Sequence, residues 1–120
     1  MKGRRALLLT KVQAVIREQV LEAVVVRLVM IGVRGLTVGP ARGAGNATGR
    51  TQVFRGLPYG EAFATRVLIE WYGPEEEADA VVRAIQQRAN TGEVGDGRVF
   101  VERVEEAVRI RTGERGAGAV

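Results

Sequence analysis

The stretch RVLIEWYGPEEEADAVVRAIQQRANTGEVGDGRVFV, residues 66–101, decides the fold. It opens with residues 66–72, where apolar and polar side chains alternate, which is typical of a half-buried strand. Residues 73–92 predict a helix, with three glutamates at the positive end of the helix dipole and a glycine after the last turn. Residues 98–104 predict another strand. A strand, a helix and a strand therefore follow one another.

The N-terminal half repeats this order. Residues 11–17 alternate Val12, Ala14 and Ile16 on one face, which indicates a strand. Residues 18–32 place apolar side chains at helical spacing and end at a glycine, and residues 35–42 read as a strand. The two halves together predict strand–helix–strand–strand–helix–strand, the α+β, ferredoxin-like βαββαβ pattern: an antiparallel sheet with two helices on one face. That fold serves many functions.

The remaining segments predict one domain with two short ends. Residues 1–10 read as an N-terminal extension, residues 11–111 as the domain, and residues 112–120 as a mobile, Gly-rich tail. Residues 107–111 are a further strand candidate. Residues 43–64 carry glycines and little periodicity, so they predict a long loop with a function.

Composition limits the chemistry. The 120 residues contain no cysteine and no histidine, which removes thiolate chemistry, the commonest general base and the commonest metal ligand. No catalytic residue and no metal site are assigned, and the chain is predicted not to be an enzyme. The net charge of +4 suits phosphate-bearing partners without specifying them. The apolar run near the N-terminus is too short for a signal peptide, which predicts a cytoplasmic protein.

The segment TGEVGDGRVFV (91–101) is the strongest local motif. Glycine lets a ligand approach the main chain, and successive N–H groups in such a turn can form a concave anion site. The arginine that follows adds a donor fork suited to phosphate. Taken alone, the loop is better explained as a tight turn between a helix and a strand.

Four segments resemble the PII signal-transduction proteins, a family known for nitrogen regulation. Residues 91–101 are similar to the family's T-G-x-[IV]-G-D-G-K-[IV]-F-V, and GVRGLTV (32–38) to its G-[IV]-x-G-[ML]-T-V. AVRIRTGE (107–114) resembles its closing strand and tail, [AV]-[IV]-R-I-R-T-G-E, and FRGLPY (54–59) its loop motif YRGAEY. The resemblance covers residues 11–114.

The resemblance implies a homotrimer with ATP or ADP in the clefts between subunits. It also implies that residues 43–64 form a T-loop, which docks on a partner transporter or metabolic enzyme. The protein would then lie in the cytoplasm, or at a membrane through a transporter partner. In many members the same cleft takes 2-oxoglutarate through a magnesium ion held by ATP.

The resemblance assigns nine residues to the nucleotide site. Four form the Gly-rich loop beside the phosphates, two are arginines that reach the phosphates, one contacts the adenine and two lie at the T-loop base. The loop residues are Gly95, Asp96, Gly97 and Arg98, and the arginines are Arg109 and Arg111. The adenine contact is Thr37, and the residues at the T-loop base are Gly43 and Gly45. The two arginines would share one face of the strand at 107–111, since residues i and i+2 do so. Without the resemblance they would be a solvated face of an edge strand.

The chain departs from the family at the effector side of the cleft. The T-loop base typically reads K-G-F-G-R-Q-K-G and here reads RGAGNATG (42–49). Ala47 replaces the glutamine that helps hold magnesium, and Asn46 replaces the arginine before it. Arg66 stands in place of the lysine that pairs with 2-oxoglutarate. These changes argue against strong 2-oxoglutarate binding and leave magnesium open.

The T-loop carries the candidates for partner contact, Phe54, Arg55 and Tyr59. Tyr59 matches a tyrosine that is uridylylated in some members. Tyr59 is therefore a candidate modification site, although Pro58 changes its surroundings and leaves the modification open.

Three alternatives stay beside the adenine-nucleotide sensor of nitrogen metabolism. One is a divergent PII-like sensor of carbon or bicarbonate metabolism with little response to 2-oxoglutarate. Another is a slow ATPase, which the missing histidine and cysteine weaken. The third is RNA binding on a ferredoxin-like fold, and no stacked-aromatic strand motif supports it, so no nucleic-acid partner is predicted.

Overall fold

The computed structural model describes residues 8–45, 51–54 and 57–120. In chain order its elements are β1 (Leu9–Arg17), the 3-10 turn η1 (Glu18–Val20), α1 (Leu21–Met30), β2 (Thr37–Gly45), β3 (Thr51–Phe54), β4 (Leu57–Pro74), α2 (Glu75–Ala89), β5 (Arg98–Val104) and the 3-10 turn η2 (Gly116–Ala119). The described helices include none that is long and apolar enough to cross a membrane.

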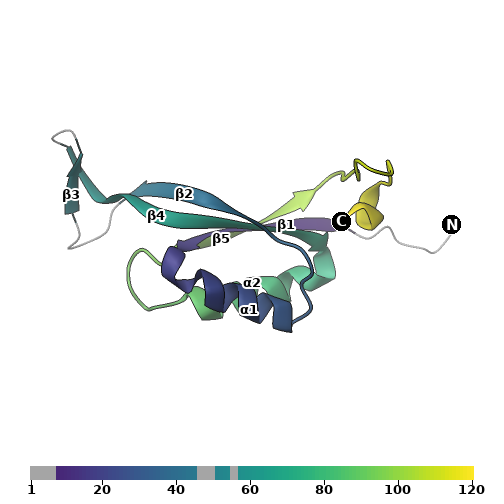
Figure 1. Ribbon diagram of the computed structural model, residues 1–120, viewed down its shortest axis with the longest axis horizontal. Helices are drawn as coiled ribbons and strands as arrows, with labels where there is room; N and C mark the ends of the chain where they lie inside the picture. Colours follow the sequence, from purple (N-terminus) through teal and green to yellow (C-terminus); the bar gives the residue numbers. More distant parts are fainter. Residues whose placement is uncertain (1–7, 46–50, 55–56) are drawn as a thin grey trace.

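The sheet is antiparallel and has the strand order β2-β4-β1-β5, with β3 pairing to the far part of β4. Both helices cover one face of this sheet, and the described residues place no second layer on the other face (Figure 1). The predicted ferredoxin-like α+β fold is therefore confirmed. Strands β1 and β4 lie in the middle, and β2 and β5 form the two edges.

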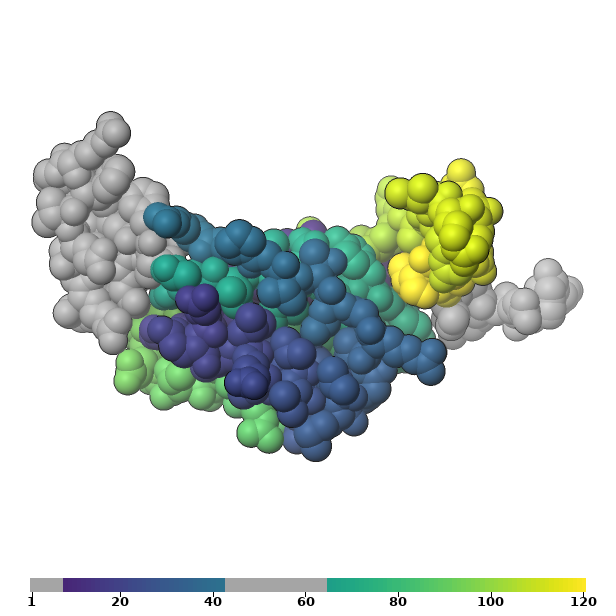
Figure 2. All heavy atoms as spheres, in the orientation of Figure 1, coloured from purple at the N-terminus to yellow at the C-terminus, as the bar shows by residue number. Residues whose placement is uncertain are grey.

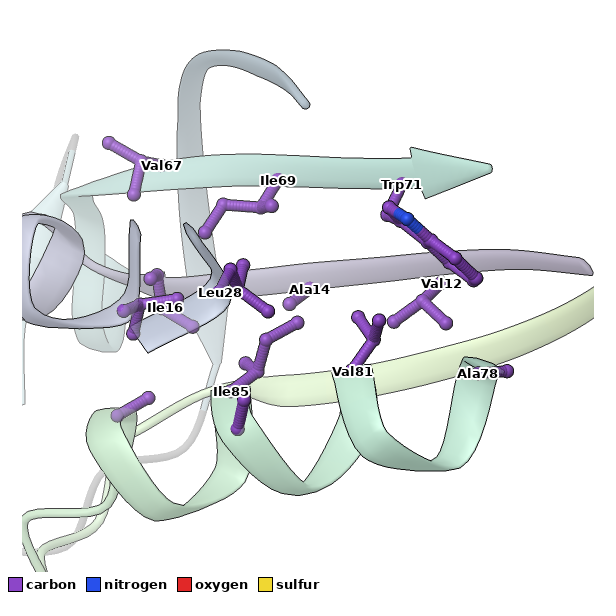
Figure 3. Close-up of a cluster of buried hydrophobic side chains, with 13 residues drawn as sticks. Val12, Ala14, Ile16, Leu28, Val67, Ile69, Trp71, Ala78, Val81 and Ile85 are labelled. Carbon is purple, nitrogen blue, oxygen red and sulfur yellow. The ribbon is translucent and has the colours of Figure 1, made fainter. Parts of the chain in front are cut away.

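The core lies between the sheet and the helices (Figure 3). From Thr10 to Arg17, strand β1 buries alternate residues, as the sequence predicts, and the residues between them lie half-buried on the uncovered face. Trp71 on β4, Leu28 on α1 and Ile85 on α2 fill the same cluster. Gly73 lies against the Trp71 indole: a Cβ built there would be 2.3 Å from Trp71 Cζ2, so only glycine fits.

The prediction of a loop at residues 43–64 is wrong in part. Strand β2 continues to Gly45, β3 spans Thr51–Phe54 and β4 starts at Leu57, so most of the described part is a paired hairpin. The register runs from Thr51 opposite Gly60 to Phe54 opposite Leu57. Main-chain pairing makes these strands, without the alternation of apolar side chains on which the prediction depended.

The prediction of a strand at residues 107–111 is also wrong. The chain turns back on itself, and Val108 forms an isolated bridge with Arg115. The N–H of Gly113 donates to the carbonyl of Arg109 at 2.7 Å, and the N–H of Arg109 donates to the carbonyl of Glu114 at 2.8 Å. We call residues 107–116 the C-terminal hairpin. Glycines at positions 113 and 116 supply its positive φ angles of 76° and 74°.

Candidate functional site

The Gly-rich loop between α2 and β5 folds around one carboxylate. Asp96 Oδ2 accepts hydrogen bonds from the N–H of Thr91 at 2.7 Å and of Gly92 at 3.0 Å. The hydroxyl of Thr91 donates to Oδ1, and Asn90 Oδ1 accepts the N–H of Gly92 at 2.8 Å. Asp96 thus fixes the entrance of the loop, and its carboxylate faces the loop's own backbone.

The loop is also fastened to the sheet by Arg17, the last residue of β1. Arg17 Nε donates to Asp96 Oδ1 at 3.2 Å, and Nη2 donates to the carbonyl of Val94 at 2.8 Å. Partial burial by itself would raise the pKa of Asp96, but the hydrogen bonds from Thr91, Arg17 and Gly92 outweigh it and lower this pKa to about 2. The carboxylate is therefore ionised at neutral pH.

Two glycines of the loop keep N–H groups that donate to no partner within the described part of the chain. They are Gly95 and Gly97, whose φ angles are 104° and 103°. A Cβ at position 97 would lie 1.8 Å from the carbonyl oxygen of Val15. Arg98, which is exposed, follows directly. Two free N–H groups beside a guanidinium form the kind of concavity that binds a phosphate.

A hollow of about 280 Å³ adjoins this loop, between α2 and β5. Apolar side chains line most of it, including Ile16, Ile85 and Val99, and Arg98 lies at its margin. It is smaller than the ~300–1,000 Å³ of most ligand pockets. One chain therefore offers the loop but no complete pocket for a nucleotide beside it.

The predicted effector side lies at the same end of the sheet. Ala41 on β2, Arg66 on β4 and Arg17 on β1 lie opposite one another in register. Arg66 Nη1 donates to the carbonyl of Thr65 at 3.1 Å. Two residues further along β2, its pairing register with β4 shifts between Gly43 and Gly45. This irregularity lies where the long hairpin leaves the sheet.

Six other predicted residues fall into three groups. Thr37 is exposed at the start of β2, opposite Glu70, so it lies further along the sheet from the hairpin root. Asn46, Ala47 and Arg55 lie outside the described residues. Phe54 and Tyr59 are placed by their backbones alone, in β3 and β4.

Arg109 and Arg111 lie far from the loop of their own chain. Arg109 Nη1 donates to Glu114 Oε1 at 3.2 Å in the C-terminal hairpin, and Arg111 is exposed in its turn. The loop precedes β5 and the hairpin follows it, and seven strand residues span about 20 Å. Figures 1 and 2 show the yellow C-terminal residues and the green residues near position 90 at opposite ends of the molecule. One chain does not bring the two arginines to the loop.

Sequence reasoning missed Arg17 and Thr91 as members of this site. Arg17 reads as an ordinary charged residue at the end of a strand. The alternation of β1 places Arg17 on the face that points away from the core, and this is the only sign in the sequence that it belongs to a site. Its partner Asp96 is 79 positions away in the sequence.

The structure thus combines a ferredoxin-like sheet with a paired hairpin and a Gly-rich loop at the same end. The family described as Nitrogen regulatory protein P-II matches residues 9–114. The chain belongs to this family, whose members are signal-transduction proteins of nitrogen regulation.

Its relatives match over nearly their whole length. The nitrogen regulatory proteins P-II of Rhizobium meliloti and Rhodospirillum rubrum are 42% and 43% identical over 110 residues, which cover 92% of this chain and 98% of each relative. Arabidopsis thaliana PII bound to citrate has a TM-score of 0.76 at 34% identity, covering 94% of this chain and 92% of that one. The Bacillus subtilis GlnK–ATP complex has a TM-score of 0.76 at 29% identity, covering 94% and 98%.

Proposed function

We propose that this PII-family protein binds ATP or ADP between neighbouring copies of a homotrimer and so regulates a partner protein. The solved relative from Bacillus subtilis is described as a complex with ATP, which supports an adenine nucleotide as ligand. The partner is a transporter or a metabolic enzyme, contacted through residues 43–64.

The observation that carries the proposal is the shape of the loop. Its carboxylate is bonded to the loop itself, while the N–H groups of Gly95 and Gly97 and the side chain of Arg98 are left for a ligand. Preset donors of this kind favour phosphate, because they lose little freedom when the anion arrives.

The distance between the loop and the C-terminal hairpin supports assembly from several copies. The loop and the C-terminal hairpin with Arg109 and Arg111 follow opposite ends of β5, whose seven residues span about 20 Å. The two arginines contribute to the phosphate site if the hairpin of one copy meets the loop of the next. A head-to-tail contact of this kind closes into a ring when its rotation fits, as in a trimer.

The uncovered face of the sheet supports the same assembly. Lys11 Nζ lies 3.5 Å from Glu70 Oε2 and 3.7 Å from Glu102 Oε1. Gln13 Nε2 donates a hydrogen bond to Glu70 Oε2 at 2.8 Å. Phe100 and Tyr72 are 49% and 40% exposed on this face. Exposed aromatic side chains are enriched at interfaces between proteins, and the charged groups between them already have partners on the same face.

The effector side differs from the phosphate side. We propose that binding of 2-oxoglutarate through magnesium is weak, because Ala47 and Asn46 supply no equivalent of the family's glutamine and arginine. No observation favours the alternatives of a slow ATPase or a bicarbonate sensor.

Titration calorimetry of the purified protein with ATP, ADP and adenosine tests the proposal. ATP and ADP are expected to bind at one site per chain, and adenosine more weakly, since it lacks the phosphates. Sedimentation of the same sample is expected to show a trimer. Absence of binding by both ATP and ADP at millimolar concentration, or a stable monomer at micromolar concentration, would overturn it.

A further inference from the structure

We infer that Arg17 is a positioning residue for the nucleotide site: it holds the Gly-rich loop in its phosphate-binding shape without touching the ligand. This inference rests on the proposed function. Arg17 lies on β1, and the loop it holds begins after α2, so the contact joins two parts of the chain that only the fold brings together.

The guanidinium bridges two points of the loop. Nε reaches the Asp96 carboxylate at 3.2 Å and Nη2 reaches the Val94 carbonyl at 2.8 Å. The Arg17 and Asp96 side chains are only 14% and 21% exposed, so solvent screens this ion pair less than a surface pair. The two bonds leave from different nitrogens of one rigid plane, so they fix the direction of the loop as well as its distance from the sheet.

Each contact point adjoins a ligand donor. Val94 immediately precedes Gly95, and Asp96 lies between Gly95 and Gly97. Arg17 therefore holds the Val94 carbonyl, which belongs to the same peptide unit as the Gly95 N–H, and the side chain of Asp96, the residue that follows Gly95. Without these contacts the glycines would be free to rotate, because they carry no side chain that restricts φ.

The anchor itself is rigid. Arg17 is paired in register with Arg66 on β4, and Ile16 before it is 1% exposed in the core. The loop thus takes its position from the central strands. A loop whose donors are fixed before the ligand arrives binds more tightly than one that must be ordered by the ligand.

The arrangement also explains the need for arginine. A lysine at position 17 would keep the charge, but it has a single ammonium and no planar fork, so it cannot reproduce the geometry of the two bonds. Arg17→Lys is expected to give an intermediate phenotype, and Arg17→Gln the full loss.

The test compares the wild type, Arg17→Lys, Arg17→Gln and a control, Arg83→Gln, by calorimetry with ATP, ADP and adenosine. Arg83 forms an exposed ion pair with Asp79 at 2.9 Å on α2, so its replacement removes the same charge away from the loop. Arg17→Gln is expected to weaken ATP binding about tenfold, the lower effect of losing hydrogen bonds to a charged group. Adenosine affinity is expected to stay at the wild-type value, as is ATP affinity in Arg83→Gln.

Amide hydrogen exchange supplies a readout that needs no nucleotide. Exchange at Thr91 and Gly92 is expected to be faster in Arg17→Gln than in the wild type, while exchange in the core of α2 is unchanged. Wild-type ATP affinity in Arg17→Gln, unchanged exchange in the loop, or an equal loss for ATP and adenosine would overturn this inference and leave the proposed function standing. A wild-type protein that binds neither ATP nor ADP would overturn both.

Discussion

Arg17 and Asp96 form an ion pair with a 3.2 Å separation between Nε and Oδ1, although 79 positions separate them in the sequence. This pair joins the end of β1 to the loop that precedes β5. Strands β1 and β5 are already paired from Leu9 to Val15, so the ion pair extends their contact beyond the last rung of the ladder. The geometry of the Gly-rich loop is therefore a property of the whole fold and not of the loop alone.

Asp96→Asn is expected to lower the stability of the protein at neutral pH but not in acid. The pKa of Asp96 is about 2 in the folded chain against an ordinary 3.8, so the carboxylate stabilises the fold above pH ~4. That contribution disappears as the pH falls toward 2. From this shift, the free energies of unfolding are expected to differ by about 2 kcal/mol above pH ~5 and to converge near pH ~2.

Urea unfolding from pH 2 to pH 7 measures this difference. Asp79→Asn is the matched control, because Asp79 lies in an exposed ion pair that contributes less than about 1 kcal/mol. A difference between wild type and Asp96→Asn that does not change with pH would contradict the role given to the Asp96 carboxylate.

Gly97→Ala is expected to destabilise the loop and remove ATP binding. The added methyl group would meet the carbonyl oxygen of Val15, and the φ angle of 103° is unfavourable for alanine. Gly35→Ala is the control, because a Cβ at that position has no neighbour within 4 Å. Thermal melts and ATP titration measure both effects. An unchanged ATP affinity in Gly97→Ala would show that the loop is not the phosphate site.

Glu114→Gln is expected to tighten ATP binding by up to about fivefold. Glu114 Oε1 lies 3.2 Å from Arg109 Nη1. An exposed ion pair of this kind contributes about 0.2–1 kcal/mol, and a phosphate that binds Arg109 must first break it. Glu76→Gln, an exposed residue in the first turn of α2, controls for the change in net charge. An equal gain in both variants would assign the effect to net charge, and weaker binding in Glu114→Gln would exclude Arg109 as a phosphate ligand.

Ala47→Gln is expected to create a dependence of ATP affinity on 2-oxoglutarate that the wild type lacks. The substitution restores the side chain that the family uses beside magnesium. ATP titrations with magnesium, with and without millimolar 2-oxoglutarate, measure the coupling for both proteins. Linked sites commonly change each other's affinity by about 5–150-fold. A wild-type coupling within that range would show that the site tolerates Ala47.

Much of the fold follows from local pattern. The alternation in residues 11–17 and 66–72 and the apolar periodicity of the helices are sufficient to predict the central strands, α1 and α2, since burial on one face sets both periods. The hairpin at β2–β3–β4 was missed because its pairing depends on main-chain hydrogen bonds and glycine, which leave no apolar pattern.

The site was predictable in part. The Gly-rich motif located the loop, and its resemblance to the family suggested the phosphate role. The motif did not reveal that Asp96 binds the loop backbone, nor that Arg17 holds it, because those contacts depend on residues far apart in sequence. Arg109 and Arg111 were expected on one strand, whereas the glycines that follow turn the chain into a hairpin.

The central claim is that one nucleotide is bound by the loop of one copy and the C-terminal hairpin of another. Two variants each lose one half of such a site: Gly97→Ala has a defective loop, and the double variant Arg109→Ala/Arg111→Ala has a defective hairpin. Neither is expected to bind ATP alone. When the two are refolded together in equal amounts, random assembly places an intact loop beside an intact hairpin at about one quarter of the interfaces.

The deciding measurement is therefore the number of ATP sites in the mixed trimers, counted by calorimetry after sedimentation has confirmed that trimers form. We expect about 0.25 sites per chain in the mixture, against about one in wild-type protein refolded in the same way. No recovered site in the mixture, with trimers intact, would contradict a nucleotide site shared between copies.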